Sequence, residues 1–81
     1  MTDDKAIFAR RCKIIRCILG SLKGKDIKWT PLEKRVVTET NCSPMVFYFT
    51  LKTTLERGWV KRKSRGLYSI TAKGLALLEV L

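Results

Sequence analysis

Histidine and glutamine are absent from these 81 residues, and asparagine occurs once, at Asn41. Without histidine the chain lacks the commonest general base, the Ser-His and Cys-His pairings of nucleophilic catalysis, and the usual metal ligand. The seven acidic residues are scattered, so no convergent pair of carboxylates is predicted. Residues 20–25 lack the spacing and the preceding strand of a phosphate-binding P-loop. We therefore expect a protein that is not an enzyme and binds no cofactor.

Cysteine is scarce, and the three residues Cys12, Cys17 and Cys42 include no Cys-x-x-Cys pair. With no histidine to complete a tetrahedral zinc site, no metal site is predicted. The favoured interpretation is that they act as small buried hydrophobes, and the alternative is a disulfide within or between chains. The shortage of thermolabile amides indicates a thermophilic source, where intracellular disulfides are known.

Long hydrophobic runs are also missing. An uninterrupted apolar stretch such as residues 45–49 is far shorter than the roughly 18 to 20 residues that cross a bilayer. Asp3 and Asp4 stand where a secretory signal would be basic. We expect a soluble, unexported, cytoplasmic protein with no membrane partner.

Negative charge is in short supply, because 17 Lys and Arg face 7 Asp and Glu and give a net charge of +10. Self-repulsion of this size destabilises a compact state unless salt screens the charge or phosphates neutralise it. The charge therefore predicts a polyanionic partner, above all nucleic acid. The alternative is a solvated basic surface with no such role.

The first predicted helix covers residues 4–22. Its apolar residues recur at intervals of three, four and seven and so share one face. They are Ile7, Phe8, Ile14, Ile15, Ile18, Leu19 and Leu22. Cys12 falls at the edge of this stripe and Cys17 off it, which predicts that Cys17 lies at the surface or in an interface.

Two further helices are predicted from their start signals. After a short strand segment at residues 26–29, Thr30 is the expected N-cap of a capping box with Pro31 first and Glu33 third, and this helix ends near Thr40. Ser43 and Pro44 start the next helix, which runs to about residue 57 with Gly58 after it.

The helix at residues 44–57 has two different faces. Phe47, Leu51, Thr54 and Leu55 are predicted to meet the core, with Tyr48 at the edge. The opposite face includes Met45, Val46 and Phe49, which a small helix rarely exposes without reason. For Phe49 two interpretations stay open: partial burial against a neighbouring helix or dimer partner, and contact with a ligand.

Residues 59–70 change to a strand pattern and predict a hairpin. Four cations crowd its tip, an arrangement that favours nearby phosphate: Lys61, Arg62, Lys63 and Arg65. Thr71 is the expected cap of a last helix, residues 72–81. This helix is richer in leucine and valine than one core needs.

This order of elements resembles the winged helix-turn-helix domain, over nearly the whole chain. The residues that carry the resemblance are 30–33 (TPLE), 43–44 (SP), 55–60 (LERGWV) and 68–78 (YSITAKGLALL). The last segment is similar to the ending of PadR-like, MarR-like and small archaeal or archaeal-virus transcription regulators. The resemblance implies one domain over residues 1–81, mainly α with a small antiparallel β wing.

It also implies that the helix at residues 44–57 enters the major groove of double-stranded DNA. The implied base-reading residues are Ser43, Met45, Val46, Phe49, Thr50 and Thr53. Lys52 and Arg57 are then phosphate contacts, and the wing at residues 61–66 (Lys61, Arg62, Lys63, Arg65) reaches the backbone or the minor groove. Lys28, Lys34 and Arg35 are implied as additional phosphate contacts. The alternatives are a nonspecific or architectural binder of DNA or RNA, and a winged-helix module that binds protein.

A symmetric homodimer through the first and last helices is expected, since these two helices carry more apolar surface than an 81-residue core can absorb. The alternative is that the leucines only close the core of the monomer. Cys17 at a two-fold axis would allow an interchain disulfide. No ligand-binding extension is present in the sequence, so no small-molecule effector is expected.

Overall fold

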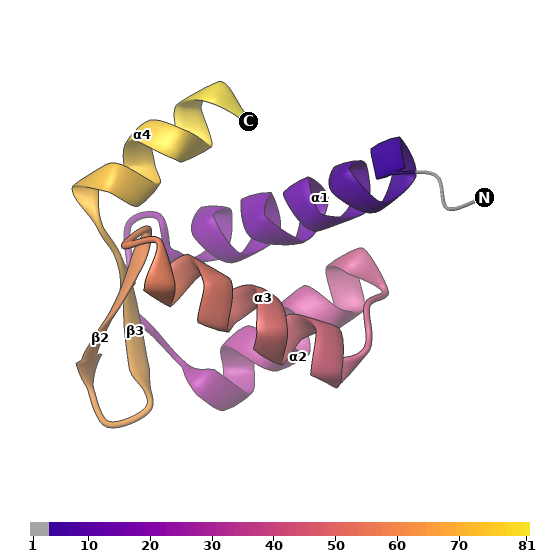
Figure 1. Cartoon of the computed structure of the whole chain (residues 1–81). Coiled ribbons are helices and arrows are strands. Elements are labelled where there is room, and N and C mark those ends of the chain that lie inside the picture. Colours follow the sequence, from indigo (N-terminus) through magenta and orange to yellow (C-terminus); the bar gives the residue numbers. More distant parts are fainter. Residues whose placement is uncertain (1–3) are drawn as a thin grey trace.

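The first helix, α1 (Asp4–Leu22), lies between the other elements of the fold (Figure 1). The computed structural model describes the backbone of residues 4–81 and the side chains of residues 11–81. The elements after α1 are β1 (Ile27–Lys28), α2 (Trp29–Thr40), α3 (Pro44–Glu56), β2 (Val60–Ser64), β3 (Leu67–Ile70) and α4 (Ala72–Val80). Over residues 4–81 the protein is thus mainly helical with one small antiparallel sheet, which confirms that part of the predicted fold class.

Helices α2 and α3 pack against one side of α1, while α4 crosses its other side (Figure 1). The sheet closes one end of this arrangement, with β3 against α1 and β2 against α3. The hairpin of β2 and β3 extends away from the helices. A long central helix is therefore the platform that positions α3 and the hairpin.

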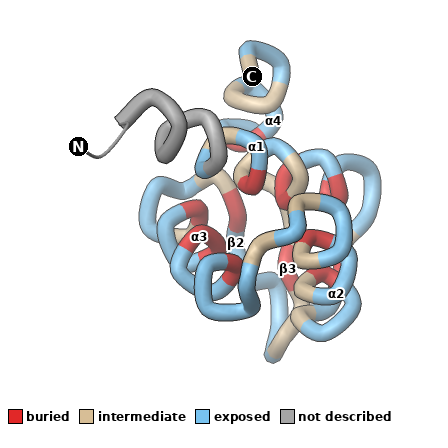
Figure 2. Tube along the Cα trace, turned by 90° about the vertical axis from the view of Figure 1, so that its right-hand side faces the viewer, coloured by how far each residue is buried: buried red, intermediate tan, exposed pale blue. Residues whose placement is uncertain are grey.

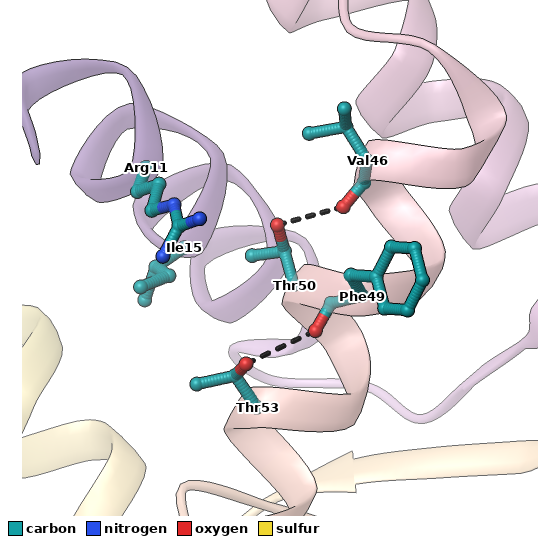
Figure 3. Close-up of a pocket in the computed structure, with 6 residues that line it drawn as sticks. All are labelled: Arg11, Ile15, Val46, Phe49, Thr50 and Thr53. Atoms are coloured by element: carbon teal, nitrogen blue, oxygen red, sulfur yellow. Dashed lines mark hydrogen bonds between the residues drawn. The ribbon is translucent and has the colours of Figure 1, made fainter. Parts of the chain in front are cut away.

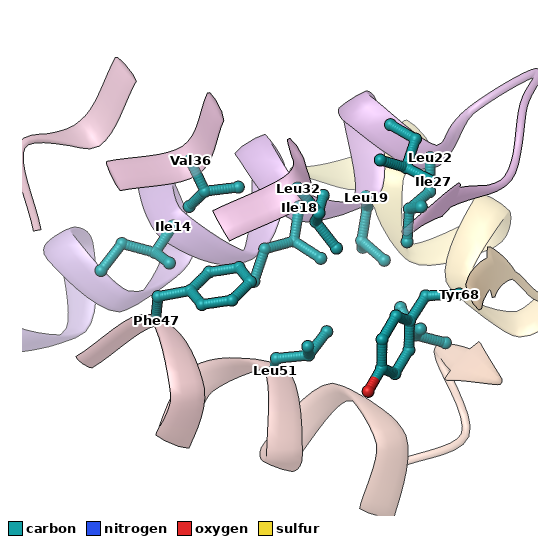
Figure 4. Close-up of a cluster of buried hydrophobic side chains, with 11 residues drawn as sticks. Ile14, Ile18, Leu19, Leu22, Ile27, Leu32, Val36, Phe47, Leu51 and Tyr68 are labelled. Carbon is teal, nitrogen blue, oxygen red and sulfur yellow. The ribbon is translucent and has the colours of Figure 1, made fainter. Parts of the chain in front are cut away.

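The core lies where α1, α2, α3 and the sheet meet (Figures 2 and 4). Helix α1 contributes Ile14, Ile18, Leu19 and Leu22, which confirms the predicted stripe in its described part. Ile7 and Phe8 lie outside the described side chains. The other elements contribute Ile27, Leu32, Val36, Phe47, Leu51, Val60 and Tyr68.

The predicted capping box of α2 is wrong. The helix begins two residues earlier than predicted, at Trp29, with Lys28 as an N-cap whose side chain makes no capping hydrogen bond. The Glu33 carboxylate accepts from the indole Nε1 of Trp29 at 3.1 Å instead of reaching back to Thr30. The Trp29 backbone N–H donates to the Gly66 carbonyl at 2.8 Å, so a contact with the hairpin fixes this start.

The turn from α2 into α3 confirms the predicted boundaries. Asn41 ends α2 in the left-handed region (φ 56°), which asparagine tolerates better than most residues. The Ser43 hydroxyl oxygen accepts from the Val46 N–H at 3.2 Å, and Pro44 follows as the first helical residue. At the other end Arg57 is the C-cap and Gly58 has a φ of 76°. Both ends of α3 are therefore set by local signals.

The three strands form a sheet in the order β1-β3-β2, with both pairings antiparallel. The register shifts between Arg62 and Ser64, so Lys63 is an extra residue in β2. Gly66 makes the turn with a φ of 73°. This sheet and hairpin confirm the predicted strand pattern.

Helix α4 begins as predicted, with the Thr71 hydroxyl oxygen accepting from the Gly74 N–H at 3.0 Å. Its leucines are not buried: Leu77, Leu78 and Leu81 are partly covered by the core, and Leu75 is exposed. The C-terminal end is held to α1, because the Arg16 guanidinium donates to the Leu81 carbonyl. Among the described residues, no helix combines the length and the apolar character needed to cross a membrane.

Candidate nucleic-acid interface

The first two turns of α3 expose a patch of apolar side chains, which we call the α3 patch: Met45, Val46 and Phe49. Met45 is 68% exposed and Phe49 is 56% exposed. The helix is anchored by Phe47 and Leu51, which are fully buried on the opposite face. The predicted division of α3 into a core face and an outer face is confirmed, and Phe49 is not buried within the monomer.

The two threonines predicted to face the bases, Thr50 and Thr53, differ in exposure. Thr50 is only 8% exposed, and its hydroxyl donates to the Val46 carbonyl at 2.8 Å. Thr53 is exposed, and its hydroxyl donates to the Phe49 carbonyl at 3.0 Å. Both hydroxyl hydrogens are therefore engaged within the helix, and Thr50 is a packing residue more than a surface contact.

A groove of about 220 Å³ separates α3 from α1 (Figure 3). Helix α1 lines it with Arg11 and Ile15, opposite Val46, Phe49, Thr50 and Thr53 of α3. Arg11 and Ile15 were not predicted from the sequence as neighbours of this surface. Their spacing of four residues on α1 was the only signal, and it says nothing about which helix they face.

An aromatic cluster holds α3 against the sheet. The Trp29 ring contacts Phe47 at 5.3 Å, Tyr48 at 5.9 Å and Tyr68 at 5.9 Å between centroids. Tyr48 in turn lies 5.5 Å from Phe49. Trp29 thus joins α2, α3 and β3, so the position of α3 relative to the hairpin is fixed by packed rings.

The hairpin cations are all exposed but are not equivalent. The Lys63 ammonium donates to an Asp26 carboxylate oxygen at 2.9 Å. Hydrogen bonds from Lys63 and Ser69 hold the pKa of the Asp26 carboxyl below its ordinary value. Lys61, Arg62 and Arg65 form no ion pair with any residue from 11 to 81, but the charge of Lys61 also helps to lower the pKa of the Asp26 carboxyl. The two arginines are therefore the freer cations of the hairpin.

The remaining predicted phosphate contacts lie on several elements. Lys28 is exposed at the end of β1, and Lys52 is exposed on α3. The Arg57 guanidinium lies 6.0 Å from the centroid of Trp59, a cation–π contact that stiffens the C-terminal end of α3. On α2, Lys34 and Arg35 line a shallow hollow of about 320 Å³, and Arg35 is paired with Glu39 at 3.5 Å.

Cys17 faces α2 of its own chain, where its thiol donates to a Glu39 carboxylate oxygen at 3.2 Å. Burial, reinforced by this hydrogen bond and by the negative charge of Glu39, raises the pKa of Cys17 to about 11. Cys17 is partly buried at this contact, and the interchain disulfide considered from the sequence stays a prediction. All three cysteines are free thiols, and the described part of the chain brings no three Cys, Asp or Glu residues together as a metal site.

We expect the Cys17 thiol to react slowly with alkylating reagents, because the thiolate is the nucleophile and is about 100-fold scarcer at pH 8 than for a thiol with a pKa of 9. In a Cys12→Ser, Cys42→Ser variant, the iodoacetamide rate measured by mass spectrometry should keep rising to about pH 11. The same variant unfolded in urea should level off near the ordinary thiol pKa. A folded-state rate that levels off near pH 9 would contradict the Glu39 contact.

No protein-family model, curated protein or solved structure matches this chain. What the surface binds therefore follows from the chemistry of its own residues.

Proposed function

We propose that this protein is a winged helix that binds double-stranded DNA and regulates transcription, with α3 in the major groove and the basic hairpin on the backbone or in the minor groove. The observation that carries the proposal is an exposed helix face together with a hairpin whose Arg62 and Arg65 form no ion pair with residues 11–81, on a chain of net charge +10. A free-standing helix end fits the major groove, and clustered cations neutralise phosphates.

Within this proposal the residues have separate roles. The α3 patch, Ser43 and Thr53 face the base edges. Lys52 and Arg57 contact phosphates beside the groove, with Lys28, Lys34 and Arg35 as peripheral contacts. Arg62 and Arg65 reach the backbone or the minor groove, where arginine is favoured. Lys61 and Lys63 lie nearer Asp26, whose carboxylate offsets part of their charge.

The test measures binding to a random-sequence duplex by fluorescence anisotropy over a range of salt concentrations. Each phosphate contact contributes about 0.9 to the slope of log K against log salt. We expect Arg62→Ala and Arg65→Ala each to reduce that slope by about 0.9 and to weaken binding at low salt. The matched control is Lys13→Ala, which removes one charge from an exposed position on α1 outside the apolar stripe.

Two results would contradict the proposal. Equal slopes for the arginine variants and Lys13→Ala would mean that net charge acts and the hairpin makes no specific contact. Negligible binding at low salt would favour the protein-binding alternative, for which the apolar α3 patch is also suited. Sequencing of the retained duplexes separates a regulator, which enriches a motif, from an architectural binder, which does not.

We further propose that the protein acts as a homodimer through α4. Its exposed residues Ala72, Leu75, Ala76, Glu79 and Val80 recur at intervals of three and four and form an outer stripe. Its other side packs on the core through Gly74, Leu77, Leu78 and Leu81. This outer stripe is apolar except for Glu79, and it exposes Leu75 and Val80, which a second copy of the protein would cover. By contrast, residues 11–22 of α1 expose no large apolar side chain.

A further inference from the structure

The outer surface of the first turns of α3 is unusual in having almost no hydrogen-bond donor to offer. Met45, Val46 and Phe49 are apolar and exposed. The hydroxyls of Thr50 and Thr53 donate to carbonyls of their own helix. Each threonine can therefore offer a ligand only a methyl group and an oxygen that accepts hydrogen bonds. The donors that remain here are on Tyr48, Lys52 and the N-cap Ser43, whose hydroxyl oxygen accepts in the cap and whose hydrogen is not used there. The exposed apolar side chains of these turns therefore cannot read guanine or adenine through paired donors and acceptors.

The major groove contains one apolar group that distinguishes a base, the C5 methyl of thymine. We propose that the α3 patch reads thymine methyl groups, so that thymine at the base pairs beneath Met45, Val46 and Phe49 determines where the protein binds. This inference rests on the proposed placement of α3 in the major groove. It adds the chemical group that is recognised and the residues that recognise it.

The charges around the patch favour DNA as its occupant. Lys52 follows Phe49 on the same helix, and Arg57 caps its C-terminal end. Helix α3 contacts β2, the strand that carries Arg62, and the hairpin that also carries Arg65 extends from there away from the helices (Figure 1). An apolar surface with cations around it suits a ligand in which methyl groups lie between anionic groups. A duplex with thymine in its major groove is such a ligand, because backbone phosphates flank the groove.

The size of the effect follows from the burial of single methyl groups. Burying one such group changes a dissociation constant by about fourfold. Two methyl groups covered by the patch therefore give about a 15-fold preference for thymine. The patch is exposed and its removal leaves the core residues Phe47 and Leu51 in place, so variants of Met45 and Phe49 are expected to fold.

The experiment replaces thymine by deoxyuridine, which lacks only the methyl group, in a duplex enriched by the protein from a random pool. Wild-type protein should bind the uracil duplex about four- to 15-fold more weakly, with an unchanged salt slope. The variants Met45→Ala and Phe49→Ala should lose this preference and bind the two duplexes alike. The matched control, Arg62→Ala, should bind both duplexes more weakly and keep the thymine preference.

The outcomes separate this inference from the proposed function. Equal affinity of the wild type for both duplexes, with a steep salt slope, would overturn methyl reading and leave DNA binding in place. A thymine preference that survives in Phe49→Ala and Met45→Ala would also overturn it, because the methyl groups would then be read elsewhere. Absence of salt-dependent binding to either duplex would overturn the proposed function itself.

Discussion

Replacing Gly74 with alanine is expected to destabilise the fold by about 3 kcal/mol or more, at the upper end of the cost of overpacking. A Cβ at this position would overlap the Trp59 carbonyl oxygen and would lie 2.9 Å from Cγ1 of Ile70. The obstacle is backbone, and the Trp59 carbonyl also accepts the Thr71 N–H at 3.1 Å, so it cannot move without breaking the start of α4. The loss in the free energy of unfolding is measured by urea denaturation, with tryptophan fluorescence as the signal.

Gly20 gives the matched control, because it is also a helical glycine. A Cβ at Gly20 would meet no atom within 4 Å, and its φ is not positive. Gly20→Ala should therefore stabilise the protein by about 0.5 to 1 kcal/mol through helix propensity. If Gly74→Ala were as stable as the wild type, the close approach of α4 to the Trp59 carbonyl would be wrong.

Much of the fold could be predicted because its boundaries depend on local signals. Ser43 and Pro44 start α3, Thr71 caps α4, and Gly58 follows α3 with a positive φ. Each of these acts through residues at most a few positions away. The apolar stripe of α1 was equally predictable, since helical spacing alone selects Ile14, Ile18 and Leu22 for one face.

The errors and omissions come from contacts between distant residues. Thr30 has the right spacing to Glu33 for a capping box. Trp29 packs on the hairpin, however, so the helix begins at Trp29, and the Trp29 indole N–H donates to the Glu33 carboxylate. Lys63 pairs with Asp26, 37 residues away in sequence, and no local pattern indicates that pair.

In the candidate interface, the positions that follow from helical spacing could be predicted, and those that depend on packing between helices could not. Helical spacing places Met45 and Phe49 outward, because it needs only the core positions Phe47 and Leu51 to be known. It could not place Thr50, whose burial depends on how closely α1 approaches. The groove with Arg11 and Ile15 exists only after two helices have packed, so sequence spacing on either helix was not enough.

Placing charge on the outer stripe of α4 is expected to give the largest loss of DNA binding. Val80 is 79% exposed and Leu75 is also exposed, so the double variant Leu75→Glu, Val80→Glu should fold as a monomer. Two half-sites held by one dimer bind with an avidity that can exceed a single site by a factor on the order of 100 or more. We therefore expect at least that loss on a two-fold symmetric site, with the molar mass measured by light scattering.

Lys23→Glu is the control that decides whether the dimer or the charge is responsible. It changes the net charge by the same two units from an exposed position in the turn after α1, away from the outer stripe of α4. This variant should remain a dimer, and its affinity for DNA should fall only by the amount that a change of two charge units causes. A wild type of monomer mass at micromolar concentration would refute the α4 interface. Equal losses of affinity in both variants would instead show that the change in net charge explains the loss and that the outer stripe of α4 adds nothing to binding.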